Sequence, residues 1–395
     1  MYDASGLLHK HTYNDRFVDE LTITSEQDQM LRDARKKVRT AIRAAFTEAR
    51  KYLKEEVPEA DVEVISKIKP MFLTQGSYAY KTLNTPCQPC QEIDLDDGVY
   101  LPMSFINKEP SKNMEWFFWI VDGALKALAK QEGWEFTKEK STCSRVTLPG
   151  NAHIDVPLYA IPDERHVKMM ESVDLRNALN RKHMSAILFS NNMAVAKQAL
   201  LDEEDVHLAD RESGWRKSDP MAIAIWFKQE IAIRGYGSGQ RLRRICRFLK
   251  GWRDFVWEKG GPSSLTLMVC AVEAYPEDDQ DRDDYALLKV VEKLPAKLSA
   301  SIHNLAFPYD SIYPRQNMVI EEIVAKANQL HNSLSSALSG SLDKNGVVRS
   351  FSDNFGNRIP ANPDYIEEIL APSVVVRRTP ARDIKPDPIP NTKAG

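Results

Sequence analysis

The sequence lacks the features on which secreted and membrane-bound proteins depend. It has five cysteines in 395 residues, an odd and sparse set that does not suggest a disulfide framework, so we expect reduced thiols. Cys87 and Cys90 have half the spacing of a zinc site but no second pair, which favours a simple loop over a structural zinc. No apolar run approaches the roughly 20 residues of a membrane span, and the first residues lack a signal peptide's apolar stretch. We therefore expect a cytoplasmic protein with no membrane partner.

An excess of positive charge is also absent. The formal net charge is −3, so the surface as a whole gains little from releasing counterions on DNA or RNA. We expect no obligatory nucleic-acid partner, whereas small anionic substrates need only a local basic pocket. Hydrophobic residues make up 43% of the chain, enough to fill the cores of two lobes.

Three aspartates in two short strand-like stretches are the most informative feature that is present. Asp94 and Asp96 lie in QEIDLDDGVYL, and Asp155 lies in AHIDVPLYA. Side chains two residues apart on a strand point to the same face, so Asp94 and Asp96 can bind the same metal ions while Leu95 faces the core. Asp155 is the best candidate for a third acid from a neighbouring strand.

Carboxylates in this pattern suit the transfer of a nucleotidyl group. In-line displacement at the α-phosphorus of a nucleoside triphosphate uses two divalent cations about 3.5–4 Å apart, which activate the attacking oxygen and stabilise the departing pyrophosphate. Mg²⁺ prefers such oxygen ligands. Upstream, Gly76 and Ser77 can form a turn whose N–H groups and hydroxyl face the β- and γ-phosphates. The residues therefore predict a nucleotidyltransferase site that holds two Mg²⁺ ions.

Two neighbours of these acids are interpreted as structural. Asp97 follows Asp96 directly, so its side chain should point away from the metals. His153 shares a strand face with Asp155, and we interpret it as a packed or solvent-facing histidine rather than a catalytic one.

Periodicity predicts a mixed α/β lobe over residues 1–165. Apolar positions at spacings of three and four indicate one long amphipathic helix over residues 25–56. A buried helix is expected at 113–130, and short strands are expected at 71–74, 94–100, 134–136, 145–148 and 153–158. This alternation of strands and helices is typical of a mixed α/β lobe.

The pattern becomes mainly helical over residues 166–370. Asp219 and Pro220 are a typical helix start, and a second, basic helix is predicted over 241–257. That helix leads into a Gly-Gly-Pro-Ser-Ser turn, so Lys250 and Ser264 either face a phosphate or only face water. Residues 371–395 contain five prolines and no helical periodicity, which predicts a disordered tail.

The segments that carry these residues resemble the bacterial cGAS/DncV-like nucleotidyltransferases, or CD-NTases. The resemblance lies in TQGSYAYKTLNTPCQPCQEIDLDDGVYLPM, TCSRV, HIDVPLYAIP and CRFLKGWRDFVWEKGGPSSLTLM, and it covers most of residues 20–275. It implies a polymerase-beta-like nucleotidyltransferase fold, with a mixed-sheet catalytic lobe packed on a helical lobe and an active-site cleft between them. The implied site comprises the metal-binding Asp94, Asp96 and Asp155, and the nucleotide-binding Gln75, Gly76, Ser77, Tyr80, Arg145, Lys250 and Ser264.

The resemblance also implies an activity. Members of this family are cyclic dinucleotide synthases, and the first choice of product is 3′,3′-cyclic GMP-AMP from ATP and GTP, a second messenger of CBASS anti-phage defence that acts on an effector. Related synthases are joined through their C-terminal residue, here Gly395, to other molecules by a ubiquitin-transfer-like E1/E2 enzyme. The alternatives are another base choice or linkage, a linear or template-independent nucleotidyltransferase, and an inactive scaffold that acts through its conjugated tail.

Overall fold

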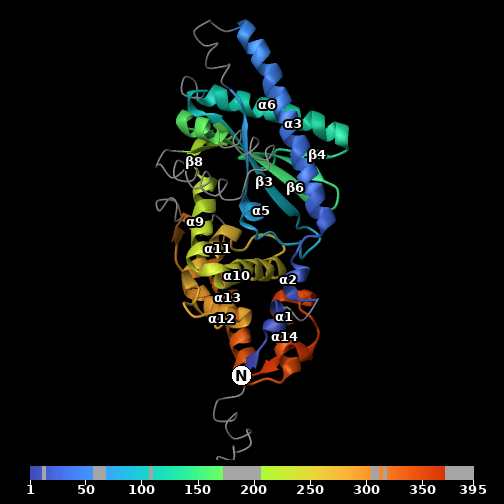
Figure 1. Ribbon diagram of the computed structural model, residues 1–395, viewed down its shortest axis with the longest axis vertical. Helices are drawn as coiled ribbons and strands as arrows, with labels where there is room; N and C mark the ends of the chain where they lie inside the picture. The colour runs from blue at the N-terminus through green and yellow to red at the C-terminus, as the bar shows by residue number, and fades with distance from the viewer. Residues whose placement is uncertain are drawn as a thin grey trace, which may run out of the picture.

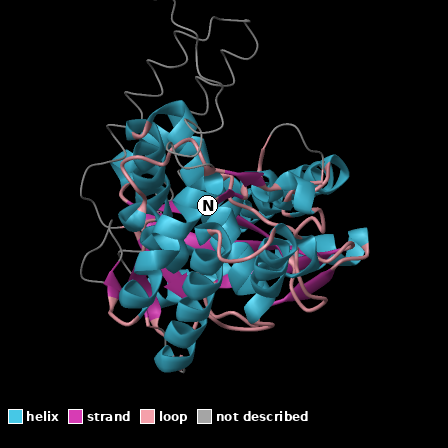
Figure 2. Cartoon of the chain, turned by 90° about the horizontal axis from the view of Figure 1, so that it is seen from below, coloured by secondary structure: helices cyan, strands magenta, loops and turns pink. Residues whose placement is uncertain are grey.

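The computed structural model describes residues 1–10, 15–56, 68–105, 110–171, 206–303, 311–314 and 318–369. Two lobes lie one above the other along the long axis, a sheet lobe above and a helical lobe below (Figure 1). Seen from below, the helices of the lower lobe lie in front of the strands (Figure 2). The predicted α/β plus α architecture is therefore confirmed. No helix in the described ranges has the length and apolar character needed to cross a bilayer.

A seven-stranded mixed sheet forms the upper lobe, with β2, β3, β6, β5 and β4 in that order and the β7–β8 hairpin attached to β6. The strands are β2 (Met71–Gln75), β3 (Ile93–Pro102), β4 (Glu135–Thr137), β5 (Cys143–Leu148), β6 (Ala152–Ile161), β7 (His207–Asp210) and β8 (Gly214–Lys217). The two central strands, β3 and β6, run parallel, and their neighbours β2 and β5 run antiparallel to them. The strands expected from sequence between residues 71 and 158 are all present.

Two helices cover one face of this sheet. They are α3 (Ser25–Glu56) and α6 (Pro110–Glu132), which contact each other. Their apolar residues form one core with Leu95 of β3 and Ile154 of β6, and these two strand residues are fully buried. Each fully buried residue of this size contributes roughly 1.5–3 kcal/mol relative to exposure. Because side chains alternate along a strand, the residues flanking Leu95 and Ile154 are left on the opposite face.

Six helices make up most of the lower lobe: α9 (Pro220–Ile233), α10 (Gly235–Val256), α11 (Ser264–Ala274), α12 (Asp283–Leu298), α13 (Ile320–Ser339) and α14 (Lys344–Phe355). The predicted start of α9 is confirmed, since the Asp219 side chain accepts hydrogen bonds from the backbone N–H groups of Met221 and Ala222. Helix α10 runs through the centre of this lobe and buries Trp252. The short β9 (Ile302–His303) and β10 (Ser311–Tyr313) pair with each other, and β10 contacts α11.

Segments of the chain cross between the lobes, so the boundary between the lobes in space differs from the sequence boundary predicted at residue 165. The N-terminal β1 (Tyr2–Asp3) pairs with β11 (Glu367–Glu368), and α1 (Ser5–Leu8) and α2 (Phe17–Glu20) lie in the core of the helical lobe. Conversely, β7 and β8 lie beyond residue 165 yet extend the sheet. Both differences arise from long-range pairing and packing, for which the local periodicity of a sequence gives no signal.

Candidate active site

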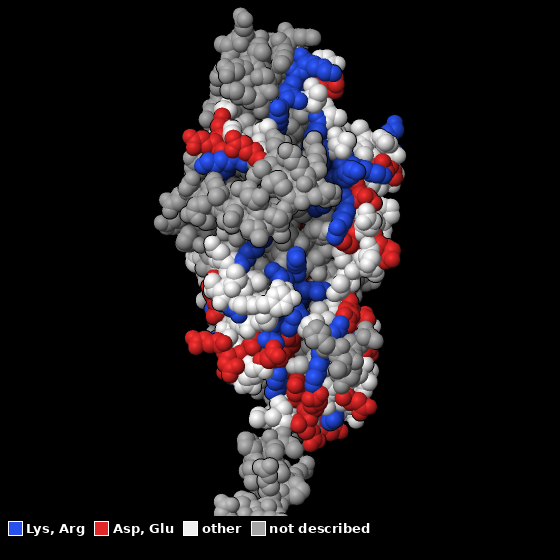
Figure 3. Space-filling model, in the orientation of Figure 1, with Lys and Arg blue, Asp and Glu red and all other residues white. Residues whose placement is uncertain are grey.

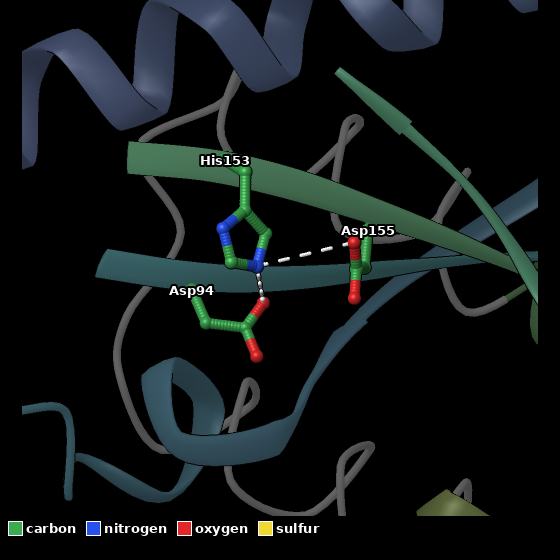
Figure 4. A group of neighbouring side chains, drawn as sticks. All are labelled: Asp94, His153 and Asp155. Carbon is green, nitrogen blue, oxygen red and sulfur yellow. Dashed lines mark ion pairs between the residues drawn. The ribbon is translucent and has the colours of Figure 1, made fainter. Parts of the chain in front are cut away.

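The acids predicted from sequence converge on the sheet face that α3 and α6 leave open. In the parallel pairing of β3 with β6, Asp94 lies opposite His153, and Asp96 lies opposite Asp155. Asp94, His153 and Asp155 each offer one ligand atom, and these atoms all lie within 4.8 Å of one another. Figure 4 shows one ring nitrogen of His153, Nε2, directed at both carboxylates. This arrangement of oxygen and nitrogen donors fits a divalent cation.

Asp96 lies against the turn between β2 and α5 (Gly76–Tyr80). Gly76 has a φ of +64°, and a Cβ at this position would lie 2.0 Å from Asp96 Oδ2. Burial raises the pKa of Asp96 to about 8, and repulsion from Asp94 and Asp155 adds to the effect. A cation bound among these carboxylates would relieve that repulsion, so the geometry favours metal binding.

Asp155 is held by two cationic side chains. Arg145 on β5 donates from Nε to Oδ1 at 2.5 Å and from Nη2 to Oδ2 at 2.8 Å, and Lys140 Nζ lies 2.7 Å from Oδ2. Burial by itself would raise the pKa of Asp155, but Arg145 and Lys140 lower it to about 2. Arg145, which the resemblance assigned to the nucleotide pocket, thus contacts the third acid as well.

Asp97 points to the opposite face, as predicted. Its carboxylate is fully buried and pairs with Arg39 of α3, whose Nε lies 2.6 Å from Oδ2. The Thr74 hydroxyl donates to the same carboxylate at 2.9 Å. This residue therefore ties the long helix to the sheet and takes no part in the acid cluster.

A cavity at the junction of the two lobes lies directly beside the acids. One part of it is lined by Gly76, Ser77, Tyr80, Thr82, Asp94, Asp96, Ser264, Leu265 and Met268. An adjoining part shares Ser77, Asp94 and Ser264 with the first and adds Lys140, Arg145, His153, Lys250 and Arg253. Lys and Arg side chains also gather on the surface at the waist between the lobes (Figure 3). The cavity thus combines a cluster of acids with a cluster of cations, as a metal–triphosphate requires.

The other residues predicted to bind nucleotide divide into two groups. Gly76, Ser77, Tyr80, Lys250 and Ser264 all line the cavity. Gln75 does not: its amide donates to the Tyr159 hydroxyl and accepts from the Tyr100 hydroxyl, both at 2.9 Å. Those two rings stack with their centroids 4.7 Å apart and hold the buried amide in place. In this structure, Gln75 positions the start of the Gly-Ser turn instead of facing a phosphate.

Sequence reasoning missed several ionisable residues that line this cavity. Lys140 and Arg253 gave no signal, because lone basic residues in loops and helices usually face water. Glu92 and His153 could have been found only from the register of β3 and β6, which places His153 against the acids. His153 is packed, as one of the two sequence interpretations had it, but it packs inside the acid cluster. The predicted conjugation site, Gly395, lies outside the described residues.

Lys250 is a buried cation. A mutation can separate the stability that its burial costs from its contribution to nucleotide binding. Its Nζ donates to the Thr82 carbonyl at 2.9 Å, and burial lowers its pKa to about 8. We expect Lys250→Met to stabilise the nucleotide-free protein by about 1–3 kcal/mol at pH 7, because a charge no longer has to be buried. The same variant should bind nucleoside triphosphate at least tenfold more weakly. Denaturant unfolding and titration calorimetry measure the two effects.

The pH dependence of this stabilisation has a definite sign. Between about pH 8 and pH 10.5 the folded protein releases the Lys250 proton while the unfolded chain keeps it, so the stability of the wild type rises with pH there. The advantage of Lys250→Met should therefore shrink above pH 8. A variant less stable than the wild type at pH 7 would contradict this description of Lys250.

Comparisons with known proteins agree with this fold and site. Residues 70–159 match the model of the "Cyclic GMP-AMP synthase DncV-like, nucleotidyltransferase domain", and residues 239–368 match that of the "Cyclic GMP-AMP synthase, C-terminal domain". The first match contains the Gly-Ser turn and all three aspartates, and the second contains Lys250 and Ser264.

Curated relatives and solved structures extend the match to nearly the whole chain. A cyclic GMP-AMP synthase of Vibrio cholerae is 31% identical, with 96% of each chain covered, and one of Escherichia coli strain TW11681 is 34% identical over 82% of this chain and 76% of that one. The crystal structure of Vibrio cholerae DncV in complex with the linear intermediate 5′ pppA(3′,5′)pG superimposes with a TM-score of 0.76 at 26% identity, covering 94% of this chain and 99% of that one. The chain therefore belongs to the family of DncV-like nucleotidyltransferases.

Proposed function

We propose that this nucleotidyltransferase is a cyclic dinucleotide synthase that joins ATP and GTP into 3′,3′-cyclic GMP-AMP and releases pyrophosphate. The observation that carries the proposal is the convergence of Asp94, Asp96 and Asp155 on one face of the sheet, beside a cavity lined from both lobes. The Vibrio cholerae relative has been solved with ATP and GTP and with a linear pppA(3′,5′)pG intermediate. Those complexes support the same two substrates for this chain.

The carboxylates of Asp94, Asp96 and Asp155 would hold Mg²⁺, as two ions. When bound, the metal lowers the pKa of the attacking 3′-hydroxyl and offsets charge on the departing pyrophosphate. The Ser77 hydroxyl, the Lys250 ammonium and Ser264 line the cavity where the triphosphate would extend. Charge-assisted hydrogen bonds from these groups would fix the α-phosphorus in line with the attacking oxygen.

A single set of acids would serve both bonds. After the first displacement, the linear intermediate would turn around so that its remaining triphosphate meets the same carboxylates. The second displacement is chemically equivalent to the first, so it needs no additional catalytic group. Most of the rate gain would then come from positioning and from charge neutralisation.

The proposed biological setting is CBASS anti-phage defence in the cytoplasm. The product would act as a second messenger that switches on an effector, so the effector is reached through the product and needs no contact with this chain. The Pro-rich residues 371–395 would serve as a tail through which an E1/E2-like enzyme conjugates Gly395. These parts of the proposal rest on the resemblance to the family and on the composition of the tail.

Product analysis tests the proposed reaction. Purified protein is incubated with labelled ATP, GTP and Mg²⁺, treated with phosphatase and examined by mass spectrometry. We expect a phosphatase-resistant product with the mass of cyclic GMP-AMP, which nuclease digestion resolves into two 3′–5′ bonds. A resistant product of another mass or linkage would replace the product assignment, and a phosphatase-sensitive product would indicate a linear nucleotidyltransferase. No product at all would favour the inactive scaffold.

A further inference from the structure

His153 has contacts that the proposed reaction does not explain. It lies on β6 two residues before Asp155, and its side chain is only 7% exposed. Its Nδ1 lies 2.6 Å from Glu92 Oε2, while its Nε2 lies 2.9 Å from Asp94 Oδ1 and 3.9 Å from Asp155 Oδ1. The ring therefore contacts Glu92 through Nδ1, and its Nε2 is directed at the carboxylates of Asp94 and Asp155 (Figure 4).

The Glu92 contact determines what the other ring nitrogen can do. A carboxylate accepts the Nδ1 proton, so neutral imidazole keeps its lone pair on Nε2, the atom aimed at the acids. Nε2 and Asp94 Oδ1 are both buried and lie 2.9 Å apart, and no other residue in the described part of the chain supplies a hydrogen bond to either atom. Two buried electron-rich atoms that face each other are stabilised when a cation lies between them.

Asp155 can complete such a site. Its Oδ1 accepts one hydrogen bond, from Arg145 Nε, and a carboxylate oxygen has room for a second interaction. Asp94 Oδ1, His153 Nε2 and an Asp155 oxygen then supply two oxygen donors and one nitrogen donor. A carboxylate that accepts from the far nitrogen of a ligating histidine, as Glu92 does, is the usual support of such a ligand.

We propose that His153 is a nitrogen ligand of the divalent cation held by Asp94 and Asp155, and that it makes this position select first-row transition cations over Mg²⁺. Mg²⁺ favours oxygen donors and keeps its waters, whereas imidazole suits transition metals. The inference rests on the metal site of the proposed function but goes beyond it, since an all-carboxylate site would not discriminate in this way. Glu92 acts as the positioning residue that fixes the tautomer and orientation of the ring.

Pulsed electron paramagnetic resonance with Mn²⁺ as the probe tests the proposed bond directly. Half an equivalent of Mn²⁺ is added to nucleotide-free full-length protein, and electron spin echo modulation is recorded. We expect modulation from a directly coordinated ¹⁴N nucleus, replaced by the ¹⁵N pattern when the protein carries ¹⁵N-histidine. Bound Mn²⁺ without nitrogen coupling, or no bound Mn²⁺ at millimolar concentrations, would overturn the proposal. This readout uses wild-type protein, so it does not depend on whether a variant folds.

Affinity measurements on variants test selectivity. We expect His153→Gln to weaken Mn²⁺ binding at least tenfold and Mg²⁺ binding less than threefold, and Glu92→Gln to weaken Mn²⁺ binding roughly ten- to a hundredfold. His166→Gln is the matched control, because His166 is equally buried in the same lobe but contacts the Lys69 carbonyl. Its Mn²⁺ affinity should match the wild type. Equal losses for both metals in His153→Gln would indicate that His153 only orients Asp94 and would overturn its role as a ligand.

These experiments separate the two proposals. Metal binding is measured without nucleotide, so a negative result removes the nitrogen ligand and leaves the synthesis of a dinucleotide in Mg²⁺ unaffected. Conversely, failure to find a cyclic product would not change the nitrogen coupling expected for bound Mn²⁺.

Discussion

Asp94→Asn combined with Asp96→Asn is expected to reduce dinucleotide synthesis by about a thousandfold or more, because the variant cannot hold the cations that activate the attacking hydroxyl. The fold should survive the change. Asparagine is nearly isosteric with aspartate, and it removes the repulsion that adds to the effect of burial in raising the pKa of Asp96 to about 8. Initial rates with saturating Mg²⁺, together with thermal unfolding, measure the two effects. Activity within tenfold of the wild type would remove these acids from the mechanism.

The stability of this variant should also depend on pH differently from the wild type. Between about pH 4 and pH 8 the folded protein keeps the Asp96 proton while the unfolded chain has lost it, so metal-free wild-type stability falls as pH rises through this range. The variant lacks the Asp96 carboxyl group, so it should not show this loss of stability with rising pH.

Asp97→Asn is the matched control for the double variant, since it changes the next residue of the same strand on the opposite face. It breaks the buried pair with Arg39, whose side chain is 24% exposed, so we expect a loss of about 1–3 kcal/mol of stability. Activity below the melting temperature should stay within about threefold of the wild type. Loss of activity without loss of stability would mean that Asp97 lies on the catalytic face of β3, contrary to its position in the fold.

Gly76→Ala is expected to have the second largest effect, a loss of at least about a hundredfold in activity. An added Cβ would lie 2.0 Å from Asp96 Oδ2, and the φ of +64° strains any residue with a Cβ. The turn must therefore move away from Asp96, and this movement displaces Ser77. The triphosphate that we propose to bind at Ser77 would be displaced with it. The measurement is kcat with ATP and GTP, alongside metal affinity.

Gly150→Ala provides the comparison for Gly76→Ala. Gly150 also has a positive φ, of +80°, but a Cβ there would meet nothing within 4 Å. It should cost some stability and leave kcat unchanged. If the two variants lose activity equally, backbone strain alone explains the effect and the contact with Asp96 does not.

Local patterns in the sequence predicted the parts of this site that depend on local geometry. Strand alternation placed Asp94 and Asp96 on one face and Asp97 on the other, and the helix start at Asp219 was identified from its cap and the following proline. Gly76 was recognised as part of a turn, although its contact with Asp96 was not.

What the sequence could not provide is register and tertiary pairing. The position of His153 beside Asp94 depends on how β3 and β6 align, and a shift of one residue would have moved it to the other face. The contacts of Lys140 and Arg145 with Asp155, and the packing of residues 1–10 and 15–21 in the helical lobe, depend likewise on segments distant in sequence. Gln75 was assigned to phosphates through a resemblance, and the two tyrosines that hold its amide are visible only in the fold.

Diffraction from crystals grown with Mn²⁺ and a nonhydrolysable nucleoside triphosphate tests the central claim most directly. The account predicts anomalous peaks within metal-ligand distance, roughly 2.0–2.3 Å, of carboxylate oxygens of Asp94, Asp96 and Asp155, with the triphosphate oxygens completing the coordination. Peaks elsewhere in the molecule, or a triphosphate bound away from these three carboxylates, would contradict it.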